Sequence, residues 1–207
     1  MDKFRGKYRI ASARLSDYDY GQAGTYFITI CTHNRLHYFG EIKEDKMILN
    51  GVGAMVQGFW YDIPNHFDHV SLGEFVVMPN HVHGILILDD HPVNNAVSVS
   101  AVETLQCNVS TVDSISPVDP INPFFQSISP KSGSVPTIIR SFKSVCTKYI
   151  NRYQPDLHFA WQTRYHDHII RNADAFERIS DYIRHNPKKW AEDRFYLPDE
   201  TENISNP

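Results

Sequence analysis

Residues 74–88 read EFVVMPNHVHGILIL and contain two apolar stretches separated by a Pro-Asn pair. Apolar residues make up most of both stretches, and the break at Pro79-Asn80 predicts two strands joined by a tight turn or one bulged strand. His81 and His83 alternate with Val82, so in a strand both imidazoles lie on the same face. Two such nitrogens could bind a metal ion together. A single His-x-His is a weak signal, because the alternative is one solvated histidine and one satisfied in the core.

The sequence around this stretch predicts the rest of the fold. The expected elements are strands at 24–32 and 39–49, a helix at 52–67 interrupted near Pro64, the strand or strands of 74–88, a helix at 136–153, an extended stretch at 159–170 and a helix that begins at Asn172 or Asp174 and ends before Pro187. This order predicts an α+β fold in which helices pack on one face of an antiparallel sheet.

The composition excludes several classes of protein. Of the 207 residues, 42% are hydrophobic, which is enough to build a core and excludes wholesale disorder. No run of about 18 apolar residues is present, so no membrane span is expected, and no secretory signal is expected either. Three widely spaced cysteines cannot form a disulfide framework or a four-thiolate zinc site, which favours the cytoplasm.

Charge is distributed unevenly along the chain. Residues 89–135 and 191–207 each carry a net charge of −4, whereas residues 136–190 carry ten Lys and Arg against five acidic residues, or +5. Residues 89–135 are rich in Ser and Pro and lack periodicity, which predicts a flexible surface insertion, and 191–207 is an acidic tail. The basic block permits a local phosphate-binding face even though the formal net charge is −4.

Aromatic residues interleave with this basic block and could stack nucleobases. For any single Lys or Arg, an ordinary solvated helix face is the alternative. The candidate nucleic-acid-binding residues are Arg140, Lys143, Lys148, Arg164, Tyr165, His168, Arg171, Arg184 and Lys188.

A second His-x-His pair competes with the first. His166 and His168 have the same spacing in another probable strand, and Asp167 between them could orient an imidazole. Residue types alone do not decide between the two pairs.

The last predicted helix offers a nucleophile. Tyr182 and Asn186 are four positions apart, so both side chains project from one face of the helix. A phenol could attack phosphorus, and an amide oxygen could complete the coordination of a metal. The alternative is a core tyrosine and an asparagine C-cap before Pro187.

Several motifs together resemble the REP-associated tyrosine transposases, which belong to the HUH group of single-strand transposases and relaxases. The matching segments are Met78–Gly84, Ser141–Ser144, Trp161–Arg171 and Tyr182–Trp190, with a similar opening at Asp17–Tyr20 and Tyr26–Thr32. Each motif is modest alone, but four in the same order are specific. The resemblance covers nearly the whole chain except 89–135 and the acidic tail, for which no function is carried over.

The resemblance implies one domain over 1–207, with a ferredoxin-like antiparallel sheet and a C-terminal helix that carries the nucleophile. It implies that Tyr182 is catalytic and that His81, His83 and Asn186 hold a divalent metal, Mg²⁺ or Mn²⁺, which favours the first histidine pair. Imidazole is a better partner for Mn²⁺ than for Mg²⁺, so an open and weakly held site is expected.

The leading hypothesis is a metal-dependent single-stranded DNA endonuclease and strand transferase that acts on hairpin repeat DNA through a 5′-phosphotyrosine intermediate. One alternative is a non-catalytic nucleic-acid-binding regulator with a vestigial site. Another is a zinc hydrolase built on both histidine pairs. The expected partner is single-stranded or hairpin DNA, and the expected oligomeric state is a monomer or a homodimer.

Overall fold

The structure is a computed structural model that describes residues 3–4, 7–8, 18–90 and 131–196. Its elements are β1 (Lys3–Phe4), β2 (Lys7–Tyr8), β3 (Gly24–Cys31), β4 (Gly40–Lys43), β5 (Lys46–Leu49), α1 (Gly51–Tyr61), α2 (Ile63–His66), β6 (Val70–Met78), β7 (His81–Leu88), α4 (Val135–Tyr153), β8 (His166–Ile170) and α5 (Ala173–His185), with 3-10 turns η1 (His33–Arg35), η2 (Pro155–Leu157) and η3 (Pro187–Glu192). Most of the predicted insertion, 91–130, and the end of the tail, 197–207, lie outside the described residues.

The central sheet has four strands in the order β6-β7-β3-β8, and every neighbouring pair is antiparallel. Along the chain these strands alternate with helices as β3, α1, β6, β7, α4, β8, which is the ferredoxin-like arrangement that the sequence motifs imply. The predicted extended stretch 39–49 forms a separate hairpin of β4 and β5. Of the two readings of 74–88, two strands joined by a tight turn is the one observed.

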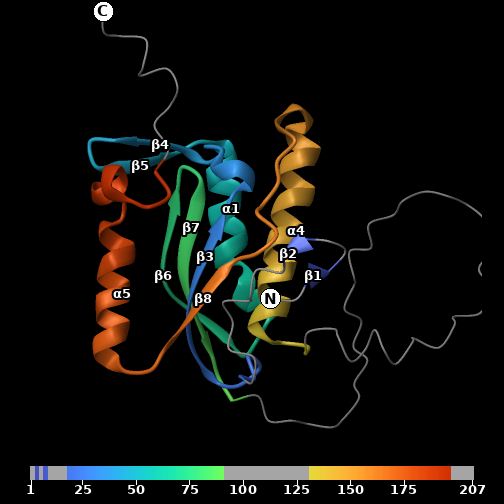
Figure 1. Cartoon of the computed structure of the whole chain (residues 1–207), viewed down its shortest axis with the longest axis vertical. Coiled ribbons are helices and arrows are strands. Elements are labelled where there is room, and N and C mark those ends of the chain that lie inside the picture. The colour runs from blue at the N-terminus through green and yellow to red at the C-terminus, as the bar shows by residue number, and fades with distance from the viewer. Residues whose placement is uncertain (1–2, 5–6, 9–17, 91–130, 197–207) are drawn as a thin grey trace, which may run out of the picture.

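The molecule has three layers, with the sheet between α5 on one side and α1 and α4 on the other (Figure 1). Alternate β3 residues, including Ile28 and Ile30, join the core with α1 and α4, whereas Ile183 of α5 packs with Ile85 and Ile170 on the opposite face. Helices α1 and α4 thus share one face, as predicted, and α5 covers the other. None of the described helices is both long and apolar enough to cross a membrane.

Gly84 explains how β7 and α1 approach so closely. A Cβ atom at this position would lie 2.3 Å from Cζ2 of Trp60, so no larger residue fits without a shift. The Trp60 ring stacks on Phe75 of β6 with 4.7 Å between the ring centroids. The glycine after the His-x-His pair therefore serves packing, and it holds β7 against the helical layer.

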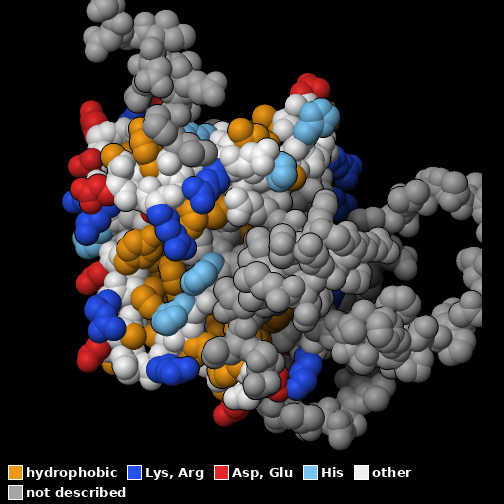
Figure 2. Space-filling view, in the orientation of Figure 1, with side chains coloured by type: hydrophobic (Ala, Val, Ile, Leu, Met, Phe, Trp, Pro, Cys, Tyr) orange, Lys and Arg blue, Asp and Glu red, His pale blue; other side chains and the backbone are white. Residues whose placement is uncertain are grey.

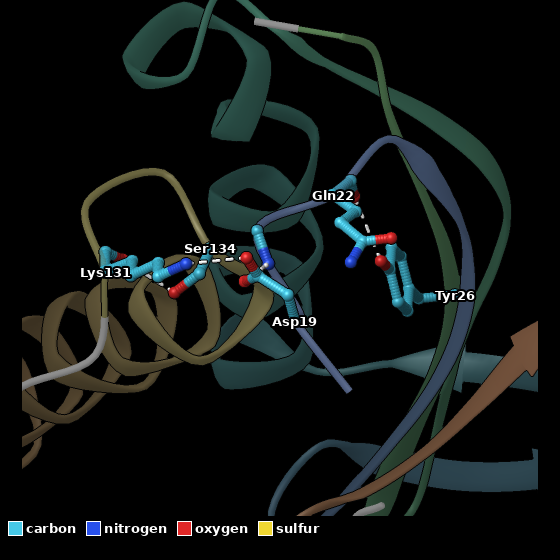
Figure 3. Close-up of polar contacts among 6 residues, drawn as sticks. Asp19, Gln22, Tyr26, Lys131 and Ser134 are labelled. Atoms are coloured by element: carbon cyan, nitrogen blue, oxygen red, sulfur yellow. Dashed lines mark hydrogen bonds and ion pairs between the residues drawn. The ribbon is translucent and has the colours of Figure 1, made fainter. Parts of the chain in front are cut away.

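A small network of polar contacts lies around the segment that precedes α4 (Figure 3). The ammonium group of Lys131 pairs with Asp19 at 2.6 Å, and the hydroxyl of Ser134 donates to the Lys131 carbonyl oxygen at 2.6 Å. Nearby, the hydroxyl of Tyr26 donates to the carbonyl oxygen of Gln22 at 3.0 Å. The predicted boundary of the insertion at 135 is therefore too late, because 131–134 already form part of the folded domain.

Candidate metal centre and active site

His81 and His83 lie side by side on the face of β7 that α5 covers. Both are buried, and their Nε2 atoms are 3.1 Å apart. Val82 between them points into the core under α1 and α4, as the period of two along a strand requires. The strand thus brings two imidazole nitrogens to one point.

Asn80 fixes the tautomer of His81. The Asn80 amide nitrogen donates to the carbonyl oxygens of Arg35 at 3.1 Å and Phe195 at 2.9 Å, so its Oδ1 is the atom that faces Nδ1 of His81 at 2.8 Å. Because that oxygen can only accept, Nδ1 of His81 carries the proton. Nε2 of a neutral His81 therefore presents a lone pair to His83.

His83 has a more adaptable partner. Its Nδ1 lies 2.8 Å from the hydroxyl of Thr29, which can either donate or accept. Burial, with a smaller contribution from neighbouring positive charge, lowers the pKa of His81 to about 3 and that of His83 well below its usual range. Both imidazoles are therefore neutral at pH 7, the form that binds metals.

Tyr182 approaches this pair from α5. The next residue, Ile183, is buried, which leaves Tyr182 on the edge of the helix with 42% of its surface exposed. Its hydroxyl lies 3.2 Å from Nε2 of His83, and its ring meets Phe27 edge-on at 6.1 Å. Burial, followed by the negative charge of Asp193, raises the pKa of Tyr182. The free protein therefore holds a neutral phenol at this position.

Asp193 completes the cluster, and the sequence reasoning missed it. One ligand atom from each of His81, His83 and Asp193 lies within 4.8 Å of the others. The carboxylate of Asp193 accepts hydrogen bonds from the backbone N–H of Phe195 at 2.7 Å and from the side-chain amide of Asn186 at 3.1 Å. Asp193 comes after η3, in the part of the chain that was predicted to be only an acidic tail.

Phe195 holds the Asp193 segment in place. Its buried ring lies 4.8 Å from the ring of His81, and the guanidinium groups of Arg35 and Arg194 lie over it at 5.2 and 4.5 Å. Guanidinium groups over an aromatic face are attracted by its quadrupole. The segment is therefore docked against the histidines through the ring of Phe195 and the amide of Asn80.

Asn186 lies close to this cluster, but its amide nitrogen is occupied by Asp193. Its side-chain oxygen is buried and makes no hydrogen bond with the described residues. A buried oxygen of this kind lacks a partner that a cation would supply. Two neutral imidazoles, a carboxylate and this amide oxygen are nitrogen and oxygen donors of the kinds that divalent first-row metal ions such as Mn²⁺ accept, so the residues fit the implied metal.

The rival pair occupies a different place. His166 and His168 lie on β8 and are exposed, and the strand register places Thr29 of β3 between His83 and His166. Neither belongs to the cluster of His81, His83 and Asp193. Within the described residues, the two pairs do not converge on one point as a four-histidine zinc site would require.

The predicted basic residues of α4 lie in the layer across the sheet from Tyr182. Arg140 is exposed and Lys148 is partly exposed. The ammonium group of Lys143 instead donates to the backbone carbonyl oxygens of Gln162 at 2.6 Å and Thr163 at 3.2 Å, and burial lowers its pKa. Lys143 therefore ties α4 to the segment before β8.

The remaining predicted residues lie on β8 or next to it in the chain, or at the end of α5. Arg184 pairs with Asp181 at 2.9 Å and lies 3.7 Å from Glu74, so acidic neighbours already surround its charge. Of the others, Arg164, His168, Arg171 and Lys188 are exposed and Tyr165 is partly buried. The structure thus places the predicted nucleic-acid-binding residues on two sides of the sheet.

Comparison with known proteins places the chain in a family. An uncharacterized protein of Haemophilus influenzae is 32% identical over 189 residues, which cover 90% of this chain and 92% of that protein. The chain belongs to the family of this protein. No family model matches it.

Two solved structures resemble the fold. One is a REP-associated tyrosine transposase bound to a REP hairpin, with 19% identity and a TM-score of 0.42, covering 91% of this chain and 74% of that one. The other is a candidate transposase of Deinococcus radiodurans R1, with 14% identity and a TM-score of 0.42, covering 89% and 96%. Both of these proteins are described as transposases.

Proposed function

We propose that the chain is a metal-dependent endonuclease and strand transferase for single-stranded or hairpin DNA that works through a 5′-phosphotyrosine. The observation that carries the proposal is the 3.2 Å separation between the Tyr182 hydroxyl and Nε2 of His83. It brings a nucleophile from α5 to the nitrogen pair of β7. The motif resemblance supplies the substrate class.

His81, His83 and Asp193 would hold the divalent ion, with the amide oxygen of Asn186 as a fourth ligand. The nitrogen donors favour Mn²⁺ over Mg²⁺. A bound divalent ion would polarise the scissile phosphate and offset the charge that develops on it. Asn80 and Thr29 orient the two imidazoles through their Nδ1 atoms, the role that outer partners of histidine ligands have in metal sites.

The residues of the chain account for the covalent step. The Tyr182 oxygen forms a bond to phosphorus while the bond from phosphorus to the 3′ oxygen breaks. Asp193, whose Oδ2 is 3.5 Å from the phenol oxygen, accepts the phenolic proton, which ends on the departing 3′-hydroxyl. The phosphotyrosine conserves the energy of the diester bond, so religation to a second 3′-hydroxyl needs no ATP.

Incubation of the protein with labelled hairpin DNA and Mn²⁺, followed by a denaturing gel, tests the proposal. A protein-linked band that requires Mn²⁺ supports it. DNA that shifts in a native gel but forms no adduct would support the regulator with a vestigial site. Protein that neither binds nor cleaves the DNA would overturn both.

A further inference from the structure

Helix α5 leaves open part of the sheet face on which the buried histidine pair lies. It packs mainly against β6 and β7, where Ile183 meets Ile85, and it also buries Ile170 at the end of β8. On the open part, which lies on β3 and β8, His166 and His168 are exposed and Phe27 is partly exposed. In the space-filling view, histidine side chains lie in the middle of one face beside a band of hydrophobic side chains, with Lys and Arg side chains around it (Figure 2).

Two depressions adjoin this open part. One has a volume of about 490 Å³ and is lined by His166, Asp167, His168 and Arg171, among others. The other, of about 290 Å³, is lined by Phe176 and again by Arg171. Asn172 also lines both, so the two depressions are neighbours. Their volumes are close to the lower end of the range for pockets that hold one small molecule.

This surface is continuous with the candidate active site. His166 is in the same cross-strand row as His83, with Thr29 between them. His168 is opposite Phe27, whose ring stacks on His83 at 5.3 Å. From His166, β8 runs about 17 Å to Arg171, and α5 then returns along the strip to Tyr182.

We propose that this strip, His166, His168 and Arg171 with Phe27 as its floor, is a subsite for the unpaired nucleotides next to the scissile phosphate. The inference rests on the proposed function. A nucleobase stacks on the exposed imidazole of His168, and the guanidinium of Arg171 binds a backbone phosphate. Planar imidazoles and phenyl rings are the groups on which unstacked bases lie, and guanidinium groups match phosphate oxygens.

The chemistry of the strip favours nucleotides over a protein partner. It combines the Phe27 ring, two exposed imidazoles and an arginine that makes no ion pair with the described residues, together with one carboxylate, Asp167, in the lining of the larger depression. Its depressions are of nucleotide size and do not form one broad apolar patch. It also begins beside the phenol that would attack the phosphate, which is where flanking nucleotides must lie.

An abasic scan tests the subsite. Once the cleaved bond has been mapped with the wild-type protein, abasic residues are placed one at a time within three nucleotides on either side of it. Binding is measured without metal by fluorescence anisotropy for the wild-type protein, His168→Ala and His168→Phe. The matched control is His185→Ala, an exposed histidine on α5 that does not line the strip.

We expect His168→Ala to weaken binding of intact DNA by about tenfold, within the range for loss of one base–aromatic stack. At one abasic position the same variant should have no further effect, because its partner base is already missing. His168→Phe should restore binding, since it keeps a planar ring, and His185→Ala should resemble the wild type.

Two other results have separate meanings. If the wild-type protein forms an adduct but His168→Ala weakens binding equally at every abasic position, or not at all, the subsite is wrong and the proposed function stands. If the wild-type protein forms no adduct with any DNA, the proposed function fails and the subsite fails with it.

Discussion

The hydroxyl of Tyr182 lies 3.2 Å from Nε2 of His83, although 99 positions separate the two residues in the chain. The contact depends on Ile183, which is buried with Ile85 and Ile170 and thereby fixes the rotation of α5 over the sheet. A helix residue beside a buried anchor has its direction set by that anchor. The position of the phenol is therefore a consequence of core packing.

The stability of the metal-free protein should depend on pH through the two buried histidines. Burial lowers the pKa of His81 from 6.5 to about 3 and moves that of His83 in the same direction. The unfolded chain binds protons at these groups below pH 6.5, whereas the folded chain does not. The stabilisation that these two neutral histidines provide is thus fully present above pH 6.5. As the pH drops from 6.5 towards 3, the free energy of unfolding falls by at most about 1.4 kcal/mol per pH unit for each group.

Urea unfolding of the metal-free protein between pH 7 and 4 measures this dependence. His81→Gln should show a shallower fall with pH, because one of the two groups is removed. His185→Gln changes an exposed histidine and should keep the wild-type slope. Parallel curves for all three proteins would show that the buried histidines do not govern the pH dependence.

Asn80 should control metal affinity without touching the metal. Asn80→Leu removes the acceptor that fixes the tautomer of His81, so Mn²⁺ binding measured by calorimetry should weaken by roughly 10–100-fold. Asn80→Asp keeps an acceptor for Nδ1 of His81 but loses the hydrogen bonds to Arg35 and Phe195, so it should bind Mn²⁺ better than Asn80→Leu. Nitrogen-15 spectra of the imidazoles report the tautomer directly. Equal losses in both variants would mean that Asn80 acts through its hydrogen bonds to the carbonyl oxygens of Arg35 and Phe195, which both variants lack, and not through the tautomer of His81.

The insertion should be dispensable for folding. Asp89 donates its backbone N–H to the carbonyl oxygen of His69, and Nε2 of His69 lies 2.8 Å from the carbonyl oxygen of Gly133. His69 thus contacts the chain both where it leaves β7 and where it returns before α4. The two ends of the insertion therefore lie close together, and a short linker can join them. The chain entropy of closing a long or a short loop differs by only about 1 kcal/mol.

A deletion of 95–128 closed with a short Gly/Ser linker should therefore keep a melting temperature within a few degrees of the full chain. A longer deletion that removes Lys131 would break its ion pair with Asp19 and its contact with Ser134, and should be less stable. A molten product from the shorter deletion would place the insertion in the core.

The sequence predicted most of the fold because local patterns decide it. Alternation placed His81 and His83 on one face of a strand, and the four-residue spacing placed Tyr182 and Asn186 on one side of a helix. The confirmed strands and helices follow the same periodicities, and the interruption predicted near Pro64 in the helix at 52–67 is observed as the break between α1 and α2.

Two features of the site could not be predicted in this way. Asp193 reaches the histidines only because the chain turns through η3 and Phe195 docks on His81, and no fixed spacing encodes that turn. The orientation of the Asn80 amide depends on the Phe195 carbonyl, 115 positions away. The sequence-based prediction named Asn186 as the third ligand beside the two histidines, and the composition of 191–207 predicted only an acidic tail.

The sequence-based and the structure-based assignments differ in the third metal ligand, which is Asn186 in the first and Asp193 in the second. Asp193→Asn removes the carboxylate charge at constant size, and we expect it to weaken Mn²⁺ binding by at least tenfold. Asn186→Ala should have a smaller effect, because its amide mainly holds Asp193 through the 3.1 Å hydrogen bond. Glu192→Gln is the matched control, an exposed acid one residue away. If Asn186→Ala abolishes binding while Asp193→Asn leaves it intact, the sequence-based ligand is the correct one.

Tyr182→Phe removes one oxygen and keeps the ring that meets Phe27. The phenol makes a 3.2 Å hydrogen bond to His83, so the change should cost about 1 kcal/mol of stability if the hydroxyl is only structural. If Tyr182 is the nucleophile, the same variant should form no covalent DNA adduct in a denaturing gel while it still binds DNA and Mn²⁺.

Tyr153→Phe is a suitable control for this experiment. Tyr153 is 65% exposed at the end of α4, and the variant should form the adduct normally. Tyr149 and Tyr165 should be changed in parallel, since an adduct that survives in Tyr182→Phe but disappears in one of these variants would assign the nucleophile to that residue. The melting temperature separates the two readings, because a near-normal value with no adduct cannot arise from loss of the fold.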